Sequence, residues 1–249
     1  MIRFIALISF ITLFAADARA QGNVPLVADL SNHLVAITTG FSGTDVLLFG
    51  ATDGPGDIAV VVRGPSEAEV IRRKGRQGPI WLNAEEVAFR DVPSYYRVAS
   101  SRPLAEFAPQ NLLSRYQIGV ENVRMNTVAD AGLEPEEVAD FRKAFVRLKT
   151  ESNLYDQGLG AINFMSNRLF RTDLHFPSNV PTGTYLVEVY LFRDGDVTSA
   201  EIVPLNISQI GASADIFDFA HNFAPLYGIV SILLAATAGW VASVVFRRT

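Results

Sequence analysis

The chain has 249 residues, a formal charge of −5 and no cysteine. Without cysteine it cannot form disulfides, use a thiol nucleophile or bind a metal through sulfur. Between residues 21 and 223 the formal charge is −8, which argues against a nucleic-acid partner and against broad adhesion to anionic lipid. The sequence therefore describes a domain that depends on its apolar core for stability.

Residues 1–20 have the features of a secretory signal peptide. Arg3 precedes an eleven-residue apolar run, Phe4 to Phe14, and small residues at 18 and 20 fit a peptidase site. The run is shorter than the roughly 20 residues that cross a bilayer as a helix. We therefore expect an exported protein whose mature chain begins at Gln21. An uncleaved N-terminal anchor is the alternative.

The next region, residues 21–103, predicts a β-sandwich. Runs of β-branched and aliphatic residues at 34–39, 45–52 and 57–64 are separated by Gly, Pro and Asp. Seven or eight short strands at this spacing favour an immunoglobulin-like fold. The candidate core aromatic residues of this domain are Phe41, Phe49 and Trp81.

Residues 104–210 predict a mixed region of helices and antiparallel strands. A short helix is expected over 109–116 and a longer one over 135–150. The longer helix carries apolar residues at spacings of three and four, which predicts a face that packs on the core of the exported domain. These residues are Val138, Phe141, Phe145 and Leu148.

A strand over 183–192 ends at Asp194-Gly195, a typical hairpin turn, and a second strand runs back from it. These strands either form a small sheet under the longer helix or complete a second sandwich. The sequence leaves open whether they share one core with residues 21–103. The exported part is therefore expected to be mainly β with a helical insertion.

A juxtamembrane segment, 211–225, leads into an uncharged stretch at 226–246 that predicts a transmembrane helix. The tail, 247–249, contains two arginines, which stay on the cytoplasmic side of a membrane, so the large domain is expected on the outside. A buried core helix is the alternative. Ala235 and Gly239 stand four residues apart, a spacing that lets a second membrane helix approach closely.

No catalytic motif is evident, and neither a cofactor nor a metal site is expected. The chain has no GxSxG motif and no P-loop. Asp173 and His175 could face the same side of a strand, and Asp29 precedes His33 by four residues, but neither spacing is specific. A metal-dependent enzyme that uses Asp173 and His175 is therefore only the third hypothesis for function.

The most unusual charge pattern is the basic run Arg72, Arg73, Lys74 and Arg76. If strands over 68–73 and 79–82 pair, residues 74–78 connect them and the basic side chains project into solvent. Such a tip is either a plain solvated turn, a site for an anion or acidic partner that also includes Arg63 and Trp81, or a contact with lipid headgroups. Only Glu67 and Glu69 are expected nearby as counter-charges.

Four stretches, at 40–52, 57–65, 72–83 and 92–104, together with the closing span, resemble the alphaproteobacterial putative transmembrane protein family. The resemblance brings no activity and no catalytic residues. It implies a bacterial inner-membrane protein with its large domain in the periplasm, and an accessory role beside a sulfite-type anion permease. We therefore expect a non-enzymatic accessory protein, with a small-oxyanion-binding module that uses residues 72–76 as the alternative.

Overall fold

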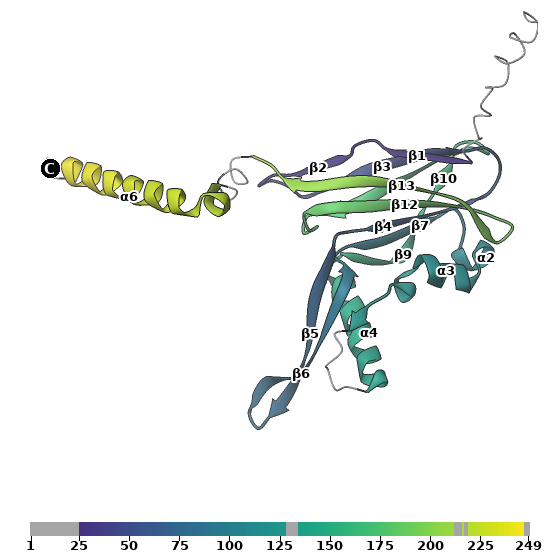
Figure 1. Ribbon diagram of the computed structural model, residues 1–249, viewed down its shortest axis with the longest axis horizontal. Helices are drawn as coiled ribbons and strands as arrows, with labels where there is room; N and C mark the ends of the chain where they lie inside the picture. Colours follow the sequence, from purple (N-terminus) through teal and green to yellow (C-terminus); the bar gives the residue numbers. More distant parts are fainter. Residues whose placement is uncertain (1–24, 128–133, 212–215, 217–218, 247–249) are drawn as a thin grey trace, which may run out of the picture.

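The computed structural model describes residues 25–127, 134–211, 216 and 219–246. The expected signal peptide, 1–20, and the tail, 247–249, lie outside these residues. The described chain is mainly β, with a few helices and one C-terminal apolar helix, which confirms the predicted fold class. Figure 1 shows the body, a long hairpin that projects from it, and the C-terminal helix.

Two of the sheets pack face to face. Sheet A is antiparallel, in the order β1 (Leu26–Leu30), β3 (Gly43–Thr52), β11 (Leu169–Pro177) and β10 (Asn163–Phe164). Sheet B has the order β2 (Leu34–Ile37), β13 (Asp196–Gln209), β12 (Gly183–Arg193), β4 (Asp57–Arg63), β7 (Tyr96–Ser100) and β9 (Tyr155–Ala161). The immunoglobulin-like topology stays a prediction.

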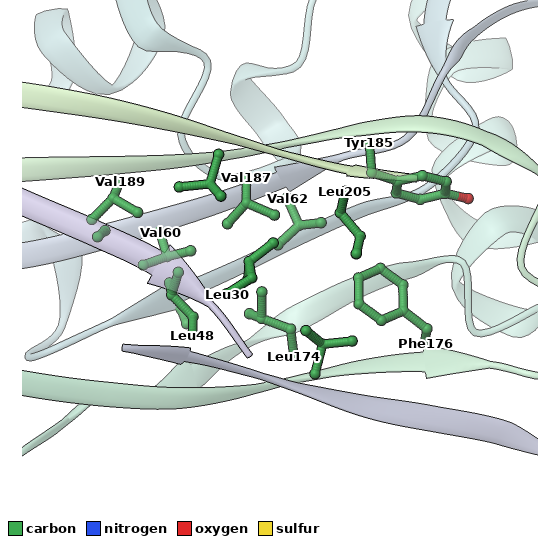
Figure 2. Close-up of a cluster of buried hydrophobic side chains, with 14 of the residues drawn as sticks. Leu30, Leu48, Val60, Val62, Leu174, Phe176, Tyr185, Val187, Val189 and Leu205 are labelled. Atoms are coloured by element: carbon green, nitrogen blue, oxygen red, sulfur yellow. The ribbon is translucent and has the colours of Figure 1, made fainter. Parts of the chain in front are cut away.

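The first core lies between sheets A and B (Figure 2). Strict alternation of buried and exposed residues along β1 and β11 directs one face of sheet A inward. Leu48 and Val60 from the first half of the chain meet Leu174 and Val187 from the second half, all at most 1 % exposed. The question left open by the sequence is thereby answered: the two β-rich regions share one core.

A second core covers the outer face of sheet B. Strand β4 is buried on both faces, which explains why its sequence is a continuous apolar run and not an alternating one. Ala59 and Val61 face this second core. It is closed by α2 (Leu104–Phe107), α3 (Gln110–Tyr116), the 3₁₀ helix η1 (Val120–Asn122) and α4 (Pro135–Glu151).

Helix α4 forms where the sequence predicts it. Pro135 occupies its first turn, and the backbone N–H of Glu134 donates to the Glu137 carboxylate at 3.0 Å in a capping box. Phe141 and Phe145 are buried in the second core, but Leu148 is 44 % exposed. The buried part of the predicted apolar face therefore does not include Leu148.

Of the predicted core aromatic residues, only Phe41 packs against the first core, and it is half-buried. Phe49 is 46 % exposed, because its neighbours on β3 face inward and alternation turns it to the outer face. Trp81 is 65 % exposed, because it lies at the end of the projecting hairpin. The core assignments of Phe49 and Trp81 are wrong.

Two further sequence predictions hold. The β12–β13 hairpin turns at Asp194 and Gly195, with φ angles of 52° and 79°, as the Asp-Gly pair indicates. Helix α6 (Ala224–Phe246) has 23 residues. An 18-residue window within it has a mean hydropathy of 2.2, and the body covers none of that window. The helix is therefore long and apolar enough to cross a membrane.

Candidate interaction surface

The third sheet, sheet C, consists of β5 (Ser66–Gln77), β6 (Ile80–Pro93) and the short β8 (Asn126–Thr127). Strands β5 and β6 form the hairpin that projects from the body in Figure 1. Their pairing continues to Gln77 opposite Ile80, and the chain reverses at residues 78–79, where Gly78 has a φ of +64°. The basic run is therefore strand, and the predicted connection over 74–78 is wrong.

Strand geometry divides the basic run between two faces of the hairpin. Directly paired residues share a face, and successive residues along a strand alternate. Arg72 lies opposite Glu86, whereas Arg73 lies opposite Glu85. Lys74 and Arg76 follow Arg72 on its face, so a row of three basic residues lies on one side and Arg73 lies on the other.

The face that carries Arg73 is attached to α4. The Arg73 guanidinium carbon lies 4.7 Å from the centroid of the Phe141 ring, and its Nη1 lies 3.0 Å from Oε2 of Glu85. Closer to the body, Lys149 Nζ lies 2.6 Å from Glu69 Oε1. These contacts hold the part of the hairpin nearest the body against α4.

On the opposite face of the hairpin, a smaller share of the basic side chains is paired with a carboxylate. Arg72 Nε donates to Glu86 Oε2 at 2.9 Å, and Arg76 Nε donates to the carbonyl oxygen of Gly78 at 3.1 Å. Within the described residues Lys74 makes no hydrogen bond or ion pair. We expected Glu67 and Glu69 to be the nearby counter-charges, and this expectation is wrong. Instead, the pairing of β5 with β6 places Glu86 beside Arg72 and Glu85 beside Arg73.

The tip is apolar as well as basic. Ile80, Trp81 and Leu82 are 54 %, 65 % and 43 % exposed, and Trp81 is the cross-strand partner of Arg76. Residues 74–83 contain Lys74 and Arg76 but no acidic residue. The hairpin therefore presents an uncompensated positive charge next to three large apolar side chains.

Arg63 lies apart from this surface. It forms an ion pair with Glu188 and donates through Nη2 to the carbonyl oxygen of Tyr116 at 2.6 Å. The Tyr190 hydroxyl donates to the same Glu188 carboxylate at 2.6 Å. The Arg63 side chain is only 19 % exposed, so it fastens α3 to sheet B instead of reaching solvent.

The two histidine pairs named from the sequence are separate and exposed. His175 Nδ1 lies 2.7 Å from Oδ1 of Asp45, while Asp173 lies two residues away on the same outer face of β11. His33 Nε2 lies 3.1 Å from Oδ1 of Asp29. Over the described part of the chain, no three His, Cys, Asp or Glu side chains gather as metal ligands would.

The sequence did not reveal a cleft of about 900 Å³ at the end of sheet B, beside the β12–β13 turn. It contains two ion pairs, Arg102 with Asp57 and Arg193 with Asp53. Arg102 donates to both carboxylate oxygens of Asp57, at 2.8 and 2.6 Å, and these hydrogen bonds lower the pKa of Asp57. No local pattern joins residues 45 positions apart, so only the fold could bring this pair together.

A second cleft, of about 850 Å³, lies between α2, α3, η1, α4 and the edge strand β9. Its lining is mostly apolar, from Val98, Leu104, Leu113 and Val146, with Arg142 and Lys143 on the α4 side. Glu121 and Asp156 contribute the opposite charge. The lining thus carries no excess of either sign that would select an ionic ligand.

The comparisons with known proteins bear on the chain as a whole. A search of curated proteins finds no match to this chain. A family model described as "Putative transmembrane protein (Alph_Pro_TM)" matches residues 25–248, which include both cores, the projecting hairpin and α6. The chain therefore belongs to this transmembrane protein family, as its resemblance indicated.

Proposed function

We propose that this protein is a non-enzymatic accessory subunit that is anchored in a bacterial inner membrane by α6 and associates there with an integral-membrane partner. The observation that carries the proposal is the surface of α6, which the described body leaves uncovered. The expected signal peptide and the terminal arginine pair support a single-pass arrangement, with the body in the periplasm and the C-terminus in the cytoplasm.

The two sides of α6 differ in side-chain size. At 100° per residue, five of the small residues fall within about 80° of one another on the helix. They are Gly228, Ser231, Ala235, Gly239 and Ala242. The opposite side carries Leu233, Trp240, Val241 and Val244. Small residues allow close backbone approach between membrane helices, so this stripe supports the predicted contact through Ala235 and Gly239.

Packing, and not hydrogen bonding, would drive this contact. The Ser231 hydroxyl donates to the carbonyl oxygen of Tyr227 at 2.8 Å, and the Thr237 hydroxyl donates to that of Leu233 at 2.9 Å. These hydroxyl groups are satisfied within the helix, so they do not require a polar group on a partner. The partner helix would therefore be selected by its shape.

The class of partner comes from the family resemblance alone. That resemblance suggests an anion permease of the sulfite type. Cross-linking of the tagged full chain in native membranes, followed by detergent extraction, tests the association. We expect a multi-span protein to be recovered with the unmodified chain and lost with the double variant Ala235→Leu and Gly239→Leu.

The matched control is the double variant Leu233→Ala and Val241→Ala, which changes the bulky side of the same helix. It is expected to retain the partner. Recovery of the cross-linked chain only as monomer or self-oligomer, or equal recovery from both double variants, would contradict the proposal.

A small-oxyanion-binding module remains the second candidate function. It is supported by Lys74 and Arg76, which face no acidic side chain on the hairpin. Calorimetry of the full chain in detergent with sulfite, sulfate and thiosulfate is the test. Heat that disappears in the double variant Lys74→Gln and Arg76→Gln would support it, and no heat at millimolar ligand would end it.

A further inference from the structure

The end of the β5–β6 hairpin combines three properties. It projects from the body (Figure 1), it exposes three large apolar side chains, and it carries positive charge on an otherwise acidic protein. Each property constrains what the tip can contact.

The apolar part is a short convex edge. Ile80, Trp81 and Leu82 are consecutive, so their side chains point to both faces of the strand and surround its end. A stable protein interface usually buries more than about 1,000 Å², with a hot-spot residue seated in a pocket and a rim around it. Three residues at the end of a narrow arm provide little of that area, but they suit insertion into a soft layer.

Strand pairing fixes which face of the hairpin carries the basic side chains. Trp81 is paired with Arg76, and Lys74 follows two residues further back on the same face. When Trp81 enters the interfacial layer of a membrane, both cations reach the level of the lipid headgroups. A Lys or Arg near an anionic membrane surface is attracted to the headgroups, and Trp is enriched at this depth.

The arm that carries the tip is braced along part of its length. Phe89 of β6 packs against Phe145 of α4, with ring centroids 5.9 Å apart, and Arg73 lies over Phe141 further out. Beyond Arg73 the described hairpin residues make no hydrogen bond, ion pair or ring contact with α4, and the register shifts between Arg73 and Lys74. The brace thus ends where the apolar and basic tip begins.

We propose that this tip is a second membrane contact: Trp81, Ile80 and Leu82 insert into the interfacial layer of a membrane that contains anionic lipid, and Lys74 and Arg76 bind the headgroups. The acidic body is repelled by such a surface, so the contact is confined to the tip. Together with α6, this contact would fix the orientation of the body relative to the bilayer.

Chain length permits both contacts at once. Ten residue steps separate Gln209, the end of β13, from Phe219 and span at most ~36 Å when extended. The helical residues 219–222 add about 7 Å before α6 begins at Ala224. Twelve residues of β5 extend the hairpin by ~40 Å. The body therefore has enough chain to hold the tip at the surface of the membrane that α6 crosses.

Tryptophan fluorescence of the full chain tests the proposal. The protein has two tryptophans, so Trp240→Phe leaves Trp81 as the single probe. This variant is reconstituted into vesicles of phosphatidylcholine alone or of phosphatidylcholine with phosphatidylglycerol. In the anionic vesicles we expect Trp81 emission at shorter wavelength, quenching by brominated lipid, and at least twofold weaker quenching by aqueous acrylamide than in detergent.

Charge variants of the Trp240→Phe protein test whether the attraction to anionic lipid depends on charge at the tip or on the net charge of the whole protein. Lys74→Gln with Arg76→Gln is expected to remove most of the added protection in anionic vesicles. Lys143→Gln with Arg147→Gln removes the same charge from the exposed side of α4, where the side chains are 80 % and 70 % exposed, and is expected to leave Trp81 protected.

Two outcomes would overturn the proposal. The first is a Trp81 that stays open to acrylamide and is not quenched by brominated lipid in both kinds of vesicle. The second is protection of Trp81 in native membranes but in neither kind of vesicle, which would assign the tip to a protein partner. Neither outcome bears on the α6 association, because that contact is measured by cross-linking with an intact tip.

Discussion

Arg73 of β5 lies over the ring of Phe141 of α4, with 4.7 Å between the guanidinium carbon and the ring centroid. The contact converts a residue of the basic run into a brace between the hairpin and the helix. Its neighbour Arg72 points to the opposite face and contacts only Glu86 among the ion pairs of the described chain. Adjacent arginines that look equivalent in the sequence therefore have different roles.

This difference predicts unequal effects on stability. Arg73→Gln removes a cation–π contact and an ion pair, and we expect the free energy of unfolding to fall by about 1 kcal/mol. Arg72→Gln removes one exposed ion pair and should cost less than about 0.5 kcal/mol. Urea unfolding of both variants measures the two values, and equal losses would contradict the assignment of Arg73 as a brace.

The buried ion pair between Arg63 and Glu188 predicts a larger effect. Arg63→Leu leaves a carboxylate that is only 10 % exposed without its cation, and we expect a loss of about 3 kcal/mol. The double variant Arg63→Leu and Glu188→Leu should recover part of that loss, because both charges are then absent. Unfolding of the two variants and of the parent chain gives the comparison, and a double variant less stable than Arg63→Leu would count against this reading.

The sequence predicts those parts of the fold that depend on local spacing. The strands over 34–39, 45–52 and 57–64, the helix after Pro135 and the Asp194-Gly195 turn all follow from residues near one another in the chain. Pairing between distant strands is a different matter. Strand β3 joins β11 across more than a hundred residues, so no local pattern divides the chain into sheets A and B.

The candidate surface shows the same limit. The sequence identifies the basic run and Trp81, but it cannot assign Arg72 and Arg73 to opposite faces without the strand bounds. A connection was expected over residues 74–78, whereas β5 continues to Gln77. A turn at Gly78 alone would place Arg72 opposite Glu85. The register shift between Arg73 and Lys74 instead places Arg72 opposite Glu86 and Arg73 opposite Glu85, and no local sequence pattern indicates that shift.

The second core predicts a steep loss of stability at α4. Phe145 is 1 % exposed and its ring centroid lies 5.7 Å from that of Tyr155, so Phe145→Ala is expected to cost about 3–5 kcal/mol. Leu148, one turn later, is 44 % exposed, and Leu148→Ala should cost less than about 1 kcal/mol. Thermal unfolding of both variants checks the difference. Similar losses would mean that the predicted face extends as far as Leu148.

The ion pair in the first cleft predicts a dependence of stability on acid pH. Hydrogen bonds from Arg102, with a smaller contribution from its charge, lower the pKa of Asp57 below its ordinary value of 3.8. Because the folded-state pKa is the lower one, the unfolded chain binds the proton first as the pH falls. The stabilisation by Asp57 is therefore complete above the ordinary pKa and is lost as the pH falls through the folded-state value.

Asp57→Asn should accordingly lower the free energy of unfolding at neutral pH and make little difference at the acid end, where Asp57 is protonated in the parent chain as well. Urea unfolding of both proteins over a series of pH values measures the gap between the curves. Asp140→Asn is the matched control, since its pair with Lys143 is exposed on α4 and stabilises little. A gap that stayed constant into strong acid would show that Asp57 acts through the shape of its side chain and not through its charge.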